Sequence, residues 1–319
     1  MPDRREFIKT VAGFGAAAAL PATLLAAPLR AQRLHFGSQT NAWGNPVKTY
    51  DHLREILDAL AAAGYAGFET NHASLDGLKD KAAECRQAFE SRHVQLIAPH
   101  CSVVFFDQGK VESELPPLLA IARYSAQMGA THLIVSGRRL PHTDGKLDLA
   151  AAHAKAAGLN QLGEAVKKEG LKLCYHNHVQ EFEDDPSEMS ILLAETHPKT
   201  VWLNYDIGNA YPQGPDPATF SQEHFRRIAI YHIKDERPID PNAPAAPSGP
   251  GPGAKRRTTE SCALGEGKIN LAGVVAPLLK SNWKGWLTVE REGNYPHGVE
   301  DPPAAVKQCR DYLRKITGV

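Results

Sequence analysis

Residues 171–183 read LKLCYHNHVQEFE, and this stretch is the starting point for the fold. Its first half has the apolar character that is typical of a buried strand. Its second half places His176, His178 and Glu181 where that strand ends. In a parallel α/β protein, ionisable groups at the carboxyl end of a strand indicate an active site. Two interpretations are open: hydrogen-bonded core histidines beside a surface glutamate, or the rim of a metal site.

Strand-like runs of this kind recur along the chain and alternate with helical runs. The runs lie at 34–40, 67–71, 94–100, 131–137, 171–178, 200–206, 228–235 and 285–292. Amphipathic stretches such as YDHLREILDALAAAG lie between them, and several end in glycine, as helix C-termini do. Eight such units predict a single-domain α/β protein, a (β/α)8 TIM barrel. A doubly wound open sheet is the alternative, but no G-x-G-x-x-G follows the first run.

The first 31 residues are predicted to be an export signal and not part of the fold. Arg4 and Arg5 precede an Ala-rich, weakly apolar stretch. This pattern is typical of a twin-arginine signal, and cleavage is expected after Ala31. We therefore expect a barrel over 32–319, a periplasmic or secreted location, and no stable membrane insertion after cleavage. An uncleaved signal anchor is the alternative, which the proline and glycines of the stretch disfavour.

The charge balance of the chain gives no sign of a nucleic-acid partner. Lysine plus arginine equals aspartate plus glutamate, at 36 each. Such a balance gives no reason to expect nucleic acid as a partner. The five cysteines are scattered without a C-x-x-C pair, so a disulfide scaffold is not expected. Cys262 lies in a polar loop and is expected to be exposed.

A Pro/Gly-rich connection at 237–270 interrupts the alternation after the seventh strand. Its composition predicts little regular structure over most of its length. Loops that follow barrel strands frame the active site, so the segment is interpreted as a lid. A surface insertion with no role at the site is the alternative.

Alternation along the strands predicts which side chains share a face. Shared faces are predicted for Trp202, Asn204 and Asp206, for Ile230, His232 and Lys234, for Thr288, Glu290 and Glu292, and for Leu96, Ala98 and His100. Buried carboxylates are costly alone, but several of them around a histidine are explained by a divalent cation. The predicted ligands are Glu181, Asp206, His232 and Glu290. Three oxygen donors and one imidazole favour Mn²⁺, with Mg²⁺, Co²⁺ or Zn²⁺ as alternatives.

The same alternation bears on the opening stretch. His176 and His178 share strand parity, so both are expected to face the barrel interior. Glu181 has the wrong parity for that face if the strand continues. The strand is therefore predicted to end or bend near Val179, so that Glu181 turns back over the barrel.

Five segments in this order resemble the sugar phosphate isomerase/epimerase superfamily of xylose isomerase-like TIM barrels. They are YHNHVQEF, NYDIGNA, YHIKD, LGEGKIN and GWLTVERE. The resemblance implies one metal ion, held by ligands that correspond here to Glu181, Asp206, His232 and Glu290. Asn209 stands where many relatives have a histidine. The superfamily includes DNA-repair endonucleases, but this chain lacks their extra ligands, so His100 is interpreted as a substrate contact.

The resemblance implies a divalent-metal-dependent isomerase or epimerase acting on a sugar or keto-sugar. Glu181 and Glu290 would act as acid and base on either side of an enediolate. A lyase or dehydratase acting on a keto-glycoside or inosose passes through the same enediolate and is the alternative. A sugar-binding barrel without catalysis is a further alternative.

The expected partner is a small carbohydrate, and several side chains are predicted to contact it. They are His100, His178, Asn209, Lys234 and Arg237. For each of them, a structural ion pair or core hydrogen bond is the alternative. Glu69 is expected either to contact the substrate or to brace a neighbour. Because no phosphate-binding glycine loop is present, a non-phosphorylated substrate is favoured.

Overall fold

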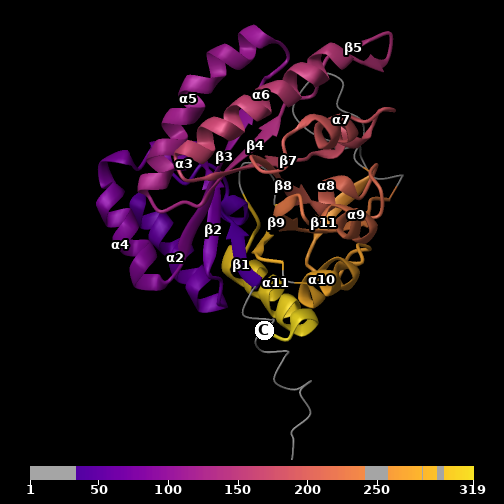
Figure 1. Ribbon diagram of the computed structural model, residues 1–319. Helices are drawn as coiled ribbons and strands as arrows, with labels where there is room; N and C mark the ends of the chain where they lie inside the picture. Colours follow the sequence, from indigo (N-terminus) through magenta and orange to yellow (C-terminus); the bar gives the residue numbers. More distant parts are fainter. Residues whose placement is uncertain (1–33, 241–257, 282, 293–297) are drawn as a thin grey trace, which may run out of the picture.

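A closed barrel of eight parallel strands forms the centre of the molecule (Figure 1). The computed structural model describes residues 34–240, 258–281, 283–292 and 298–319. Around the barrel the strands follow the order β1, β2, β3, β4, β7, β8, β9 and β12, and β12 pairs with β1. Their bounds are Leu34–Gln39, Gly67–Asn71, Gln95–Val103, His132–Gly137, Lys172–His176, Val201–Asp206, Ile228–Ile233 and Gly285–Val289. The predicted (β/α)8 TIM barrel is confirmed.

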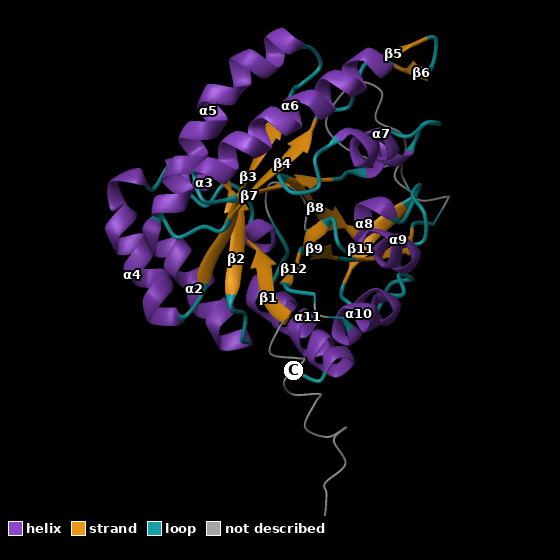
Figure 2. Cartoon of the chain, viewed as in Figure 1, coloured by secondary structure: helices purple, strands orange, loops and turns teal. Residues whose placement is uncertain are grey.

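Helices surround the barrel, and two short ribbons lie outside it (Figure 2). The α-helices are α2 (Tyr50–Ala63), α3 (His72–Asp76), α4 (Ala82–Arg92), α5 (Gln108–Gln127), α6 (Leu149–Lys168), α7 (Glu188–Glu195), α8 (Ile207–Ala210), α9 (Pro217–His224), α10 (Leu271–Lys280) and α11 (Pro302–Thr317). The 3-10 helices are η1 (Thr40–Trp43), η2 (Lys79–Lys81) and η3 (Val179–Phe182). The ribbons pair β5 (His142–Thr143) with β6 (Lys146–Leu147), and β10 (Asp235–Pro238) with β11 (Thr259–Cys262).

Apolar side chains pack on both faces of the sheet. The large core lies between the strands and the helices and contains residues such as Phe68 and Leu203. A separate cluster fills the barrel interior, where a Cβ on Gly67 would meet both Ile97 and Trp286. Complete burial of one large apolar side chain contributes about 1.5–3 kcal/mol to the free energy of unfolding. Because the interior cluster occupies the lower layers, the carboxyl end of the barrel is free for polar residues.

Helix α11 is hydrogen-bonded to the C-terminus of helix α2. Arg310 Nε donates to the carbonyl oxygen of Gly64 at 3.1 Å, and Arg314 Nη2 donates to that of Ala63 at 2.7 Å. The Arg310 guanidinium also lies 4.0 Å from the centroid of the Phe36 ring, within range of a cation–π contact. These bonds satisfy carbonyls at the C-terminus of α2, which have no partner within that helix.

One predicted strand face is wrong. Leu96 packs in the outer core, whereas Ile97 and Ala98 both lie in the interior cluster. The register between β2 and β3 shifts between Phe68 and Glu69. An extra residue in one strand interrupts the alternation of side chains, so Leu96 and Ala98 face opposite sides.

The Pro/Gly-rich segment contains more regular structure than its composition predicts. Ribbon β10–β11 pairs Asp235 with Cys262. Cys262 was expected to be exposed, and this prediction is wrong, because the pairing holds its side chain against the body at 4% exposure. The middle of the predicted lid, 241–257, lies outside the described residues.

The predicted export signal at 1–31 also lies outside the described residues. Within the described ranges, none of the helices has both the length and the apolar character needed to cross a membrane.

Gly163 on α6 packs directly against the chain at the start of β8. A Cβ at this position would lie 2.7 Å from the backbone oxygen of Thr200 and 3.0 Å from Val201 Cγ2. Because backbone cannot move aside cheaply, we expect Gly163→Ala to lower the free energy of unfolding by about 1–3 kcal/mol. Urea unfolding measures the change. Gly77→Ala is the control, since its Cβ would meet nothing closer than 3.4 Å; equal losses in both variants would contradict the prediction.

Candidate metal centre

Four adjacent strands bring four ligand-type side chains together. They are His176 on β7, Asp206 on β8, His232 on β9 and Glu290 directly after β12, and we call them the metal group. One ligand atom from each lies within 4.8 Å of the others, and all four residues are buried. Each ends or follows a parallel strand, so the group lies at the carboxyl end of the barrel. Two imidazoles and two carboxylates are donors that divalent transition metals accept.

Unpartnered atoms in the metal group fit a bound cation. His232 Nε2 lies 2.6 Å from Glu69 Oε2, so this nitrogen can donate its proton and leave Nδ1 with a lone pair. His232 Nδ1 lies 2.6 Å from Glu290 Oε2, yet within the described ranges neither atom has a hydrogen-bond partner. Metal-bound histidines are commonly held by a carboxylate on their other nitrogen. Glu69 therefore braces His232, one of the two roles expected for it.

Burial and charge set the protonation of the two histidines. Burial lowers the pKa of His176 to about 4, so its imidazole is neutral near pH 7, as a metal ligand must be. Burial also opposes a charge on His232, but the Glu69 and Glu290 carboxylates outweigh it and raise its pKa to about 10. A cation that binds the group must therefore displace a proton from His232.

Neighbouring amides fix Asp206 in place. Its Oδ1 accepts from the backbone N–H of Asn209 at 2.8 Å and so caps α8. Its Oδ2 accepts from Asn209 Nδ2 at 2.9 Å and lies 3.2 Å from His176 Nε2. Asn177 Nδ2 donates to the Asp206 carbonyl at 2.9 Å, and the Asp206 N–H donates to Asn177 Oδ1 at 2.9 Å. Asn209, predicted as a substrate contact, thus holds a residue of the metal group.

A buried lysine balances the carboxylates. Lys234 Nζ lies 3.0 Å from Asp206 Oδ2, 3.3 Å from Glu290 Oε2 and 2.9 Å from Glu292 Oε1. Burial works against its charge, but these carboxylates hold the pKa of Lys234 well above its ordinary value. Burial alone would raise the pKa of Glu290, yet Lys234 and His232 hold it well below the usual range. An ammonium group therefore lies beside a carboxylate anion of the metal group.

The other predicted substrate contacts divide into two sets. The rings of His100 and His178 have centroids 4.8 and 5.0 Å from that of His176, and both residues are half-buried beside the metal group. Arg237 lies on ribbon β10–β11 instead, where its exposed side chain pairs with Glu260 at 2.7 Å. His100 and His178 can reach a ligand at the metal group, whereas Arg237 is engaged at the surface.

Glu181 faces the outer layer of the barrel. Its Oε1 accepts from the Tyr175 hydroxyl at 2.8 Å, and its Oε2 accepts from the backbone N–H of His178 at 2.8 Å. Tyr175 belongs to the outer core, on the opposite face of β7 from His176. The chain does turn at Val179, where η3 begins, but this turn carries Glu181 outward. Its role as a metal ligand stays a prediction.

His176 is the member of the metal group that the sequence analysis did not assign as a ligand. The available signal was its parity, because it pairs in register with Asn204, two residues before Asp206 on the same face of β8. Asn177 was also missed. The spacing of residues along the sequence gives no sign of its hydrogen bonds to Asp206 on the neighbouring strand.

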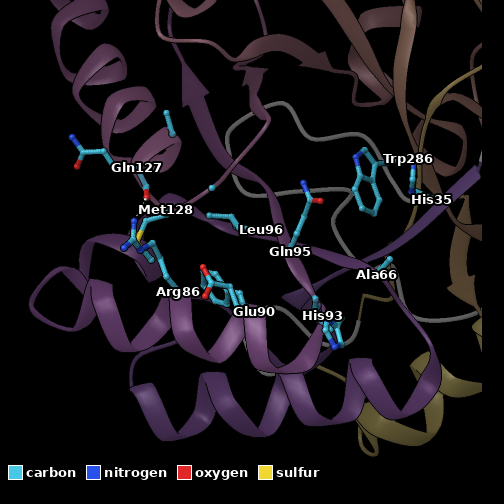
Figure 3. A pocket seen from close by; sticks show the side chains of 14 residues that line it. His35, Ala66, Arg86, Glu90, His93, Gln95, Leu96, Gln127, Met128 and Trp286 are labelled. Carbon is cyan, nitrogen blue, oxygen red and sulfur yellow. Dashed lines mark hydrogen bonds between the residues drawn. The ribbon is translucent and has the colours of Figure 1, made fainter.

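A cavity of about 690 Å³ lies at the other end of the barrel (Figure 3). Its wall includes His35, Gln95 and Trp286 at the starts of strands, and Arg86 and Glu90 on α4. Chemistry in this fold takes place where the strands end, so the cavity is separate from the metal group.

Comparison with known proteins agrees with this geometry. The family model for the xylose isomerase-like TIM barrel matches residues 57–316. The chain belongs to this family. The resemblance to xylose isomerase-like TIM barrels noted in the sequence is thereby confirmed.

Relatives within reach of sequence comparison include two inosose dehydratases. The chain is 33% identical over 268 residues to that of Bacillus licheniformis, covering 75% of this chain and 81% of the relative. It is 24% identical over 283 residues to that of Geobacillus kaustophilus, covering 83% and 88%. A solved sugar phosphate isomerase/epimerase from Parabacteroides distasonis has a TM-score of 0.67 at 19% identity, covering 89% and 98%, and shares the fold.

Metal titration distinguishes His176 from Glu181 as ligands. We expect the wild-type protein to bind one divalent cation per chain, measured by calorimetry with Mn²⁺ and Zn²⁺. His176→Ala should weaken binding by more than about a hundredfold, the upper range for partners outside the coordination sphere. Glu181→Gln should bind like the wild type, because its oxygens are engaged elsewhere. His153→Ala, at an exposed histidine, is the control. If Glu181→Gln lost binding while His176→Ala kept it, Glu181 would be the ligand, as predicted from the sequence.

Proposed function

We propose that the protein is a divalent-metal-dependent lyase acting on a polyhydroxy ketone. It would remove the proton α to the carbonyl and then pass it to the substituent on the β carbon, which leaves as water or an alcohol. The observation that carries the proposal is Glu290 Oε2, which lacks a hydrogen-bond partner within the described chain and lies 3.3 Å from the Lys234 ammonium. A carboxylate beside a cationic group suits proton abstraction with charge developing on a neighbouring oxygen.

The residues in and around the metal group have separate roles in the proposed reaction. His176, Asp206, His232 and Glu290 would hold the cation, which when bound polarises the substrate carbonyl. Glu290 takes the α proton, and Asn41 Nδ2 donates a hydrogen bond to its Oε1 at 2.6 Å. Lys234 donates a hydrogen bond from Nζ to the oxygen that gains charge. His100 and His178 contact the substrate hydroxyls.

Elimination is favoured over epimerisation because neither Glu181 nor Asp206 has an oxygen available to act as a second base. Two-base epimerisation needs an acid on the opposite face of the reacting carbon, the role expected for Glu181. Both oxygens of Glu181 accept hydrogen bonds from Tyr175 and His178. Those of Asp206 are likewise occupied by Asn209. Glu290, whose Oε2 lies among the donors of the metal group, remains as the proposed base, which supports one-base chemistry.

The relatives support a substrate class. Two inosose dehydratases align over three quarters or more of this chain, so we propose a cyclic polyhydroxy ketone, with keto-glycosides next. We also propose export by the twin-arginine route to the periplasm or beyond, which favours a non-phosphorylated substrate. Mn²⁺ is the proposed cation, with Mg²⁺, Co²⁺ and Zn²⁺ as alternatives.

Proton NMR in deuterated water tests the reaction class. The metal-loaded protein is incubated with inososes, keto-sugars and 3-keto-glycosides, and we expect loss of water or an aglycone from one of them. Activity should disappear with a chelator and return with the divalent cation. Deuterium uptake with inversion at carbon would establish epimerisation instead. If no substrate changed with any cation, the remaining alternative would be a sugar-binding barrel without catalysis.

Replacement of the proposed base tests its role. Glu290→Gln keeps the side-chain size but cannot take up the proton, so we expect kcat to fall at least about a hundredfold at saturating cation. Glu195→Gln is the control, because this exposed glutamate ends α7 and its side chain pairs with the surface residue His153. An unchanged kcat in Glu290→Gln would remove the acid–base role.

A further inference from the structure

A second set of buried polar residues lies behind β7, on the side that faces helices α6 and α7. It consists of Lys155 on α6, Tyr175 on β7, Glu181 on η3 and Glu188 on α7. Each of the four is at most 2% exposed. We call these residues the back network. They belong to the outer layer of the barrel and are separate from the metal group.

Short hydrogen bonds connect the back network. Lys155 Nζ donates to Glu188 Oε1 at 2.5 Å and to the carbonyl oxygen of Arg138 at 3.1 Å. The Tyr175 hydroxyl lies 3.2 Å from Glu188 Oε1 and 2.8 Å from Glu181 Oε1. The tyrosine therefore joins the two carboxyl groups. Side chains from two helices, a strand and a turn are held in one connected unit.

The charges of the back network constrain it further. It contains one ammonium and two carboxyl groups, so full ionisation would leave an excess negative charge in a buried place. Burial raises the pKa of Glu188 to about 7, and it also raises the pKa of Glu181. Buried polar networks are rigid when every member is bonded, and loss of one member leaves its partners without compensation.

The back network reaches the metal group through the backbone of the turn. Glu181 Oε2 accepts from the backbone N–H of His178, and Gln180 Nε2 donates to the carbonyl oxygen of Gly137 at 3.1 Å. The ring of His178 packs edge-on against that of His176, with centroids 5.0 Å apart. The bond from Glu181 thus fixes the residue that stands beside the metal group.

The neighbouring strand provides an internal comparison. Tyr205 comes directly before Asp206, as Tyr175 comes directly before His176, and both tyrosines are buried in the outer core. In the part of the chain that the structure describes, the Tyr205 hydroxyl has no hydrogen-bond partner, and its ring stacks on Phe220. Packing against Phe220 explains the burial of Tyr205, whereas the Tyr175 hydroxyl is hydrogen-bonded to two carboxyl groups.

We propose that the back network positions His178 for the reaction at the metal group, with Tyr175 and Glu181 as positioning residues. Neither residue needs to touch the substrate. The expected effect on turnover rests on the proposed function, but the hold on the His178 backbone does not. Partners outside a metal site change its activity by about 10–100-fold when they are removed.

Three variants test this proposal: Tyr175→Phe, Glu181→Gln and, as the matched control, Tyr205→Phe. Each loses a hydroxyl or a charge at constant size. Three quantities are measured in the whole protein: the dissociation constant for Mn²⁺, the amide hydrogen-exchange rate of His178 by NMR, and the kcat and KM for the substrate identified by the panel.

We expect cation affinity to stay within about threefold in all three variants, because the ligand atoms are untouched. The His178 amide should exchange at least about tenfold faster in Glu181→Gln than in Tyr205→Phe, because glutamine has one acceptor oxygen, for which the Tyr175 hydroxyl and the His178 N–H must compete. KM should rise about tenfold in Tyr175→Phe and Glu181→Gln but not in Tyr205→Phe. A general loss of stability would not raise KM while leaving cation affinity unchanged.

Two results would overturn the proposal. One is an unchanged exchange rate of the His178 amide in Glu181→Gln. The other is the same KM in Tyr175→Phe and Tyr205→Phe. If the wild type turns over no substrate, the proposed function fails, and the exchange rate still decides whether the back network holds His178.

Discussion

Negative charge gathered at the mouth of the barrel is the constraint on which the rest of the structure depends. Asp206, Glu290 and Glu69 are all buried there, and buried carboxylates are costly without positive charge nearby. Lys234 supplies one such charge, and a divalent cation among the donors of the metal group would supply more. The amides around Asp206 and the bond between Glu69 and His232 hold the donors together against their repulsion.

The barrel and three residues of the metal group could be predicted because side-chain alternation is a local property of a strand. Asp206, His232 and Glu290 lie on the faces that alternation assigned to them. Alternation ends where the strand ends, and this is why Glu181 could not be placed. Its direction depends on the turn η3 and on the Tyr175 hydroxyl.

The remaining errors have a common origin in contacts between strands. Leu96 was given the wrong face because a bulge in the pairing of β2 with β3 is not encoded in either strand alone. Cys262 was expected at the surface because its ribbon forms only with a partner strand more than twenty residues earlier. The outward turn of Glu181 matters most for the proposed function, which uses one base where the reaction expected from the sequence uses two. Related enzymes can therefore share the barrel and differ in the reaction.

The barrel can close only after its last strand, β12, has been synthesised, because β12 pairs with β1. β1 pairs with β12, α11 bonds to α2, and Glu290 directly follows β12. Until β12 has left the ribosome, β1 lacks one of its two neighbours, and the metal group lacks one of its carboxylates. The four donors of the metal group can therefore come together only after β12 and Glu290 have been synthesised. If the chain is exported already folded, as a twin-arginine signal implies, the metal supply of the cytoplasm determines which ion it carries outside.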